Sequence, residues 1–92
     1  SMRILDVRKA SEFESGHVPQ AKNIPLEYIY DHLSEIEKDK TYYVHCTGGY
    51  RSVTFISILK ARGYRNLINV DGGIRAVKAG GKLALQNLSP AK

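Results

Sequence analysis

The chain has 92 residues, a single cysteine and a formal net charge of +5. That length supports one domain with one modest core. One cysteine excludes an internal disulfide, and with three scattered histidines it forms no zinc pattern. No apolar run approaches the length of a membrane span, and the N-terminus lacks a signal-peptide pattern. We therefore expect a soluble domain in a reducing compartment such as the cytoplasm, held together by packing.

The positive charge comes from 14 Lys and Arg residues against nine Asp and Glu residues. The basic residues are spread along the chain, without a dense cluster and without the interleaved aromatic side chains on which bases stack. This distribution disfavours a nucleic-acid partner. It fits a positive field around a site for a small anion.

The first half of the chain alternates short strand patterns with helical ones. Strands are expected over 3–7 and 21–24, and a short helix over 9–15 that ends at Gly16. Residues 26–36 place apolar side chains at helical spacing opposite acidic ones, which predicts an amphipathic helix.

The second half continues the same alternation. We expect a strand over 41–45, a long helix that ends near Gly63, a strand over 67–70, a tight turn over 71–73 and a short helix over 74–79. Strands alternating with helices predict an α/β fold with a small, mainly parallel central sheet.

The patterned part of the chain defines the expected domain. It covers residues 3–81, whereas 82–92 reads as a weakly patterned C-terminal tail. Ser1 resembles a remnant of tag removal, and the first strand begins almost at once. We therefore expect a module excised from the C-terminal part of a longer protein.

Cys46 stands where the strand over 41–45 gives way to a glycine-bearing loop and a helix. The first turn of a helix leaves backbone N–H groups unpaired, and these favour negative charge. Such a setting favours a reactive thiolate. The alternative is an inert cysteine in the core, but core packing does not require the glycines and the arginine that follow.

The residues after Cys46 form a candidate anion-binding loop. Gly48 and Gly49 permit a curled backbone whose N–H groups converge on a bound anion. Arg51 adds a permanent charge that can bind an anion or hold the loop against a carboxylate, and its alternative is a solvated position in the first helical turn. Thr47 and Tyr50 are expected to line the mouth and to tune substrate choice.

Asp6 and Arg8 lie at the end of the first strand, on the side where ligands gather in parallel sheets. In a functional interpretation, Asp6 supports Arg51 or the loop. In the structural alternative, which we favour, Arg8 pairs with Glu12 across the first helical turn.

Two histidines lie near these motifs. His45 precedes the thiol, and strand alternation turns adjacent side chains to opposite faces, so we do not expect it to act as a general base. His17 sits in a turn with Gly16 and Pro19, and we expect a structural hydrogen-bonding role for it.

Several motifs occur in an order that resembles the signature of the rhodanese domain. They are Leu5-Asp6-Val7-Arg8, Glu12-Phe13, Gly16-His17-Val18-Pro19-Gln20-Ala21, Asn23-Ile24-Pro25, Cys46-Thr47-Gly48-Gly49-Tyr50-Arg51-Ser52 and Asn69-Val70-Asp71-Gly72-Gly73. The resemblance implies a rhodanese-like sheet with helices on both faces. Where the family often has a tryptophan after the double glycine, this chain has Val77, a departure seen in rhodanese modules fused to metallo-β-lactamase-like persulfide dioxygenases.

The resemblance implies sulfur transfer without a cofactor or metal. Cys46 would take a sulfane sulfur from thiosulfate or a small persulfide and pass it from its own persulfide to a thiol or cyanide acceptor. The substrate-binding residues would be Thr47, Gly48, Gly49, Tyr50, Arg51 and Ser52, with Asp6 and Arg8 in support. The expected partners are the sulfur donor, a thiol acceptor and a fused N-terminal domain. Neither nucleic acid nor a membrane is an expected partner.

Two rival functions stay open. A cysteine phosphatase or arsenate reductase also places a Cys and an Arg at the two ends of an anion cradle. The related phosphatases have one residue more than the four that separate Cys46 from Arg51, which gives a tetrahedral phosphate more room. The other rival is a non-catalytic module that docks a partner or a fused domain.

Overall fold

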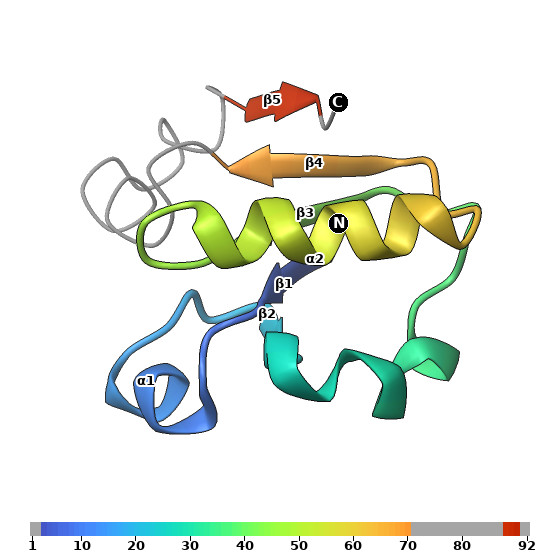
Figure 1. The fold of residues 1–92 in the computed structure, drawn as a ribbon. Coiled ribbons are helices and arrows are strands. Elements are labelled where there is room, and N and C mark those ends of the chain that lie inside the picture. Colours follow the sequence, from blue (N-terminus) through green and yellow to red (C-terminus); the bar gives the residue numbers. More distant parts are fainter. Residues whose placement is uncertain (1–2, 71–87, 91–92) are drawn as a thin grey trace.

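The computed structural model of the chain describes residues 3–70 and 88–90. Their strands form one sheet in the order β2-β1-β3-β4-β5 (Figure 1). Four strands run parallel, and the fifth pairs antiparallel with β4. The bounds are β1 Arg3–Asp6, β2 Ala21–Asn23, β3 Tyr42–His45, β4 Leu67–Val70 and β5 Leu88–Pro90. This is the small, mainly parallel α/β sheet that the sequence predicts.

Helical segments connect the strands. The α-helices are α1 Ala10–Ser15, which follows β1, and α2 Tyr50–Ala61, which follows β3. The connection from β2 to β3 holds two 3₁₀ helices, η1 Leu26–Asp31 and η2 Leu33–Glu35.

The single amphipathic helix expected over 26–36 is therefore wrong. His32 separates the two 3₁₀ segments with φ −121° and ψ 10°, and the chain bonds at three-residue spacing, as from the Ile36 N–H to the Leu33 carbonyl. Several apolar residues of this segment, such as Leu33 and Ile36, recur three positions apart, a spacing that suits a 3₁₀ turn as well as an α-helix.

The other boundaries agree with the expected ones to within a residue or two. The strand over 67–70 is confirmed as β4, and β5 falls within the segment 82–92 that the sequence left without a pattern. The turn expected over 71–73 and the helix expected over 74–79 lie outside the described residues.

The two faces of the sheet bury different side chains. One face packs against α2 and the 3₁₀ segments in a cluster that includes Leu5, Val7, Ile24, Ile29, Ile36, Tyr42, Val44, Cys46, Phe55, Ile56, Leu59, Tyr64 and Leu67. The opposite face gathers Ile4, Val18 and Val70, with Ala21 and Tyr43 against them. Strand alternation produces this division, because neighbouring residues of β1 and β3 point to opposite faces.

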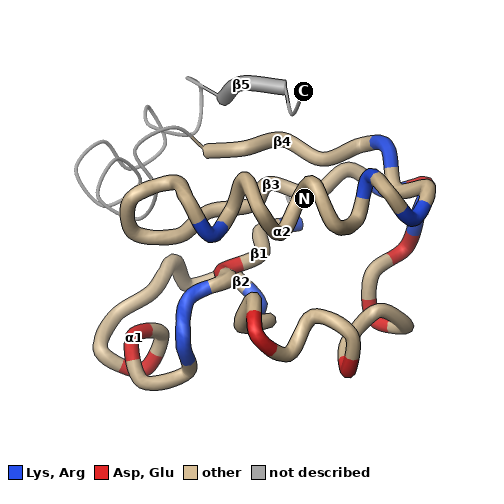
Figure 2. The backbone as a smooth tube through the Cα atoms, in the orientation of Figure 1, with Lys and Arg blue, Asp and Glu red and all other residues tan. Residues whose placement is uncertain are grey.

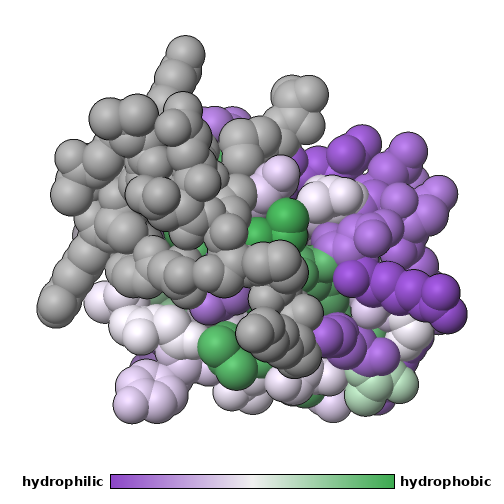
Figure 3. Space-filling model, turned by 90° about the horizontal axis from the view of Figure 1, so that it is seen from above, coloured by the Kyte–Doolittle hydropathy of each residue, from purple (hydrophilic) through white to green (hydrophobic). Residues whose placement is uncertain are grey.

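Charged residues are spread along the described chain rather than gathered in one segment, and two of them, Asp6 and Arg8, are buried. Figure 2 shows Lys and Arg positions interspersed with Asp and Glu along the backbone. Seen from above, hydrophilic side chains cover one side of the molecule, and apolar patches lie nearer its middle (Figure 3). Within residues 3–70 and 88–90, no helix is long and apolar enough to cross a membrane.

Candidate active site

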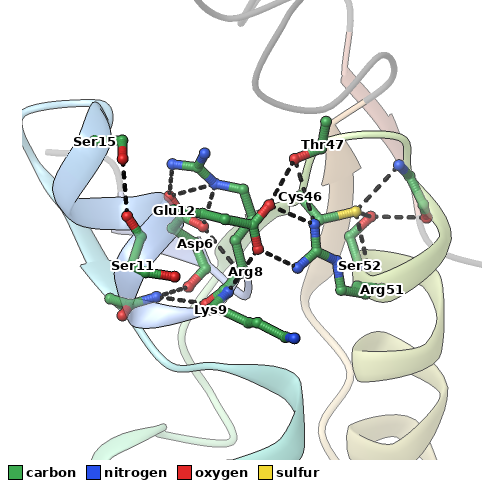
Figure 4. Close-up of polar contacts among 12 residues, drawn as sticks. Asp6, Arg8, Lys9, Ser11, Glu12, Ser15, Cys46, Thr47, Arg51 and Ser52 are labelled. Carbon is green, nitrogen blue, oxygen red and sulfur yellow. Dashed lines mark hydrogen bonds and ion pairs between the residues drawn. The ribbon is translucent and has the colours of Figure 1, made fainter.

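Cys46 follows directly after β3 and lies beneath the first turn of α2. Its Sγ accepts the backbone N–H of Gly49 at 3.1 Å and that of Ser52 at 3.3 Å (Figure 4). The residue is only 1% exposed. Two amide dipoles thus point at a sheltered sulfur, a contact that favours negative charge on it.

The loop owes its shape to Gly49 more than to Gly48. Gly49 has φ +95° and forms the N-cap of α2, a left-handed conformation that costs other residues about 1–2 kcal/mol. Gly48 does not have a positive φ, so the dihedral freedom expected at both glycines is used at Gly49 alone. Among the described residues, a Cβ built at either position meets nothing within 4 Å.

Ser52 ties the loop to the next strand. Its buried hydroxyl lies 2.6 Å from Asn69 Oδ1 on β4, 3.0 Å from the Gly49 carbonyl oxygen and 3.6 Å from Cys46 Sγ. In the sequence, Asn69 stands out only as part of the motif over 69–73. No signal in the sequence alone pairs it with Ser52, because 17 positions separate them.

Arg51 turns to a carboxylate of α1. Its guanidinium donates to both carboxylate oxygens of Glu12, at 2.6 and 3.1 Å, and to the Thr47 hydroxyl at 3.3 Å (Figure 4). The hydrogen bond from Arg51 lowers the pKa of Glu12 to about 2, and the same bond raises the pKa of Arg51. Burial opposes this rise, and weaker Coulomb contributions to the pKa of Arg51 come from Glu12, Cys46 and Asp6.

Asp6 and Arg8 pair with each other. The Arg8 side chain donates to both Asp6 carboxylate oxygens at 2.8–3.2 Å, its backbone N–H donates to Oδ1 at 3.0 Å, and Nη2 also reaches the Gly16 carbonyl. The pair is buried, with side-chain exposures of 6% for Arg8 and 0% for Asp6.

The expected pair of Arg8 with Glu12 is therefore wrong, because Arg8 pairs with Asp6. Asp6 makes no hydrogen bond to Arg51 among the described residues and adds only a weak Coulomb contribution to its pKa, and support of the loop by Asp6 stays a prediction. Asp6 follows Leu5, whose side chain faces α2, so strand alternation turns the Asp6 carboxylate to the other face and toward Arg8. Glu12 is left for Arg51.

His45 is fully buried beside this pair. It stands opposite Asp6 in the register of β1 and β3, with Nε2 4.0 Å from Asp6 Oδ2. Neither ring nitrogen has a hydrogen-bond partner among the described residues. Burial lowers the pKa of His45, the charge of Arg8 lowers it further, and Asp6 opposes both.

The structure also locates Tyr50, Thr47 and His17. Tyr50 is 87% exposed at the start of α2, whereas the Thr47 hydroxyl contacts Glu12 and Arg51. His17 stacks on Phe13 with ring centroids 3.6 Å apart, and its Nδ1 lies 2.7 Å from the Phe13 carbonyl oxygen, a structural contact.

The buried imidazole predicts a loss of stability in mild acid. The unfolded chain binds a proton at His45 near the ordinary pKa of 6.5, but the folded chain binds it only at lower pH. The free energy of unfolding should therefore fall as pH drops through about 6.5, by at most about 1.4 kcal/mol per pH unit for one proton. Urea unfolding from pH 7.5 to 5.5 measures this slope.

His45→Gln should flatten that slope, whatever its effect at pH 7.5. His17→Gln, at an exposed position, is the control for losing one imidazole. An unchanged slope in His45→Gln, or equal flattening in both variants, would contradict the assignment.

Comparison with known proteins identifies the family of the chain. The family model described as rhodanese-like domain matches residues 1–80. The crystal structure of a rhodanese-like domain from Anabaena sp. superimposes with a TM-score of 0.82 at 32% identity, covering 88% of this chain and 94% of that one. The chain belongs to the rhodanese-like domain family, and the predicted family and fold class are confirmed.

The names of curated relatives indicate the type of function found among similar proteins. A sulfurtransferase of Allochromatium vinosum is 34% identical over 73 residues, covering 79% of this chain and 68% of that protein. The uncharacterized protein YqhL of Bacillus subtilis is 37% identical over 81 residues, and the chain spans 63% of its length. Family and relatives together support a sulfur-related function of the rhodanese type.

Proposed function

We propose that the chain is a sulfurtransferase that carries a sulfane sulfur as a persulfide on Cys46. The observation that carries the proposal is the Cys46 sulfur, which accepts two backbone N–H groups from its own loop. The same contacts would stabilise a thiolate before transfer. The absence of a second cysteine in the chain leaves no internal thiol to collapse the persulfide into a disulfide.

The step is a displacement at sulfur. The Cys46 thiolate attacks the outer sulfur of thiosulfate or of an organic persulfide, a new S–S bond forms, and the old S–S bond breaks. Its electron pair leaves on sulfite or on the organic thiolate. An acceptor thiolate or cyanide then attacks the outer sulfur of the Cys46 persulfide and returns the thiolate.

The burial of Cys46 narrows the donors that can react. At 1% exposure, the residue is accessible only to a reacting atom at the end of a small group. Thiosulfate and small persulfides carry their transferable sulfur at such an end. The proposed partners are therefore a small sulfur donor and a thiol acceptor, in a reducing compartment such as the cytoplasm, with any fused domain delivering one of them.

The phosphatase alternative receives less support from the contacts. Its arginine must be free to hold a phosphate, but Arg51 donates to both oxygens of Glu12. The loop also keeps the shorter spacing from Cys46 to Arg51. A docking role without catalysis is tested by comparing sulfur release between the wild type and Cys46→Ser.

Intact-mass spectrometry tests the proposal directly. After incubation with thiosulfate or glutathione persulfide and removal of small molecules, the protein should gain about 32 Da, one sulfur atom on its only cysteine. Dithiothreitol should remove the gain, and prior alkylation of Cys46 with iodoacetamide should prevent it. No gain with either donor would overturn the proposal.

A further inference from the structure

Glu12 lies where its carboxylate affects the net charge around the Cys46 loop. It comes from α1, yet it holds the arginine that follows the cysteine loop, 39 positions away, and accepts the Thr47 hydroxyl at 3.4 Å. The Lys9 backbone N–H donates to the same carboxylate at 3.1 Å, which fixes it at the start of α1. The carboxylate is therefore an oriented part of the loop's surroundings (Figure 4).

This arrangement offsets the charge of Arg51, a guanidinium that interacts electrostatically with Cys46. Because the pKa of Glu12 is lowered to about 2, the carboxylate stays ionised at every physiological pH and offsets the charge of Arg51. The guanidinium of Arg8 is likewise offset, by Asp6. An incoming anion therefore finds the charges of both arginines already compensated by carboxylates.

The two candidate donors differ in the charge that they bring to the sulfur. Thiosulfate carries two negative charges within a few atoms of its outer sulfur. An organic persulfide carries at most one there, and none in the protonated form that a thiolate attacks, and the charges of a group such as glutathione lie farther away. A site with compensated arginines therefore disfavours the dianion.

On the basis of the proposed sulfur transfer, we infer that Glu12 is a specificity-determining residue that selects organic persulfides over thiosulfate by neutralising Arg51. Removal of its charge should free the guanidinium for a sulfonate oxygen, since arginine binds oxyanions through paired N–H donors. Glu12→Gln keeps the side-chain shape and an acceptor oxygen while removing the charge.

Alkylation of Cys46 tests the charge effect without any sulfur donor. Iodoacetate is an anion and iodoacetamide is neutral, so the ratio of their rates reports the potential at the sulfur and cancels changes in thiolate content or access. Glu12→Gln should raise the iodoacetate to iodoacetamide ratio about fivefold to tenfold. Glu12→Asp, which keeps the charge, should stay near the wild-type ratio.

Glu14→Gln is the matched control, since it removes one charge from an exposed position of the same helix. It should leave the ratio within about twofold of wild type, because an exposed charge in water is screened. An unchanged ratio in Glu12→Gln, or an equal rise in Glu14→Gln, would overturn the inference.

Steady-state kinetics tests the donor preference itself. In Glu12→Gln, kcat/KM for thiosulfate relative to that for glutathione persulfide should rise about tenfold over wild type. Sulfur transfer with an unchanged ratio would overturn the inference and leave the proposed function standing. If the wild-type chain transfers sulfur from neither donor, the proposed function and the inferred donor preference both fail. The alkylation ratio still shows whether Glu12 changes the electrostatic potential at the Cys46 sulfur.

Discussion

Replacement of Cys46 by serine is expected to lower sulfur transfer from thiosulfate or glutathione persulfide by three orders of magnitude or more, to about the background rate. A serine hydroxyl can accept the same N–H groups from Gly49 and Ser52, but it stays protonated at neutral pH and does not attack sulfur as a thiolate does. Sulfite or thiol release measures the loss.

The same variant separates chemistry from folding. Serine is slightly smaller than cysteine and keeps a hydrogen-bonding atom in place, so we expect the free energy of unfolding to change by only about 1 kcal/mol. Equal sulfur release in both proteins would favour the docking alternative. Hydrolysis of an aryl phosphate that is lost in Cys46→Ser would favour the phosphatase.

The second large effect concerns stability, at the buried pair behind the loop. Asp6→Asn should lower the free energy of unfolding by about 3–5 kcal/mol, because it leaves the Arg8 guanidinium buried without its counter-charge. The Asp6 carboxylate receives both the side chain and the backbone N–H of Arg8, so no other described group replaces it. Urea unfolding followed by circular dichroism measures the change.

Asp31→Asn is the control for this substitution. Asp31 is an exposed carboxylate at the end of η1, so the loss of its charge should change the free energy of unfolding by less than about 0.5 kcal/mol. A loss below about 1 kcal/mol in Asp6→Asn would show that the pair adds little to stability over a neutral contact.

Local signals in the sequence were sufficient to predict the framework. The β-rich run before Cys46, Gly49 after it and Gly63 at the end of the next helix mark a strand, a loop and α2 without reference to the rest of the chain. Each of these features depends on a few adjacent residues, and their order predicts a parallel sheet with the thiol at a strand end.

The charge partners could not be predicted in the same way. Glu12 and Arg51 meet across 39 positions, and several acidic residues were equally available to either arginine. Only the placement of α1 relative to the loop decides that Arg51 pairs with Glu12, whereas the contact of Asp6 with Arg8 is local, two positions apart. The 3₁₀ segments were missed for a related reason, since apolar spacing alone does not distinguish the two helix types over a short stretch.

The shelter around Cys46 also bears on how long a loaded sulfur would survive. Peroxide and stray thiols in the cell consume exposed persulfides and thiolates, and susceptibility follows exposure. Cys46 is 1% exposed and lies beneath the backbone amides of its own loop, so peroxide and other thiols have little access to it. The lifetime of the Cys46 persulfide would then depend mainly on how often a suitable acceptor reaches the site, and less on the redox state of the surrounding solution.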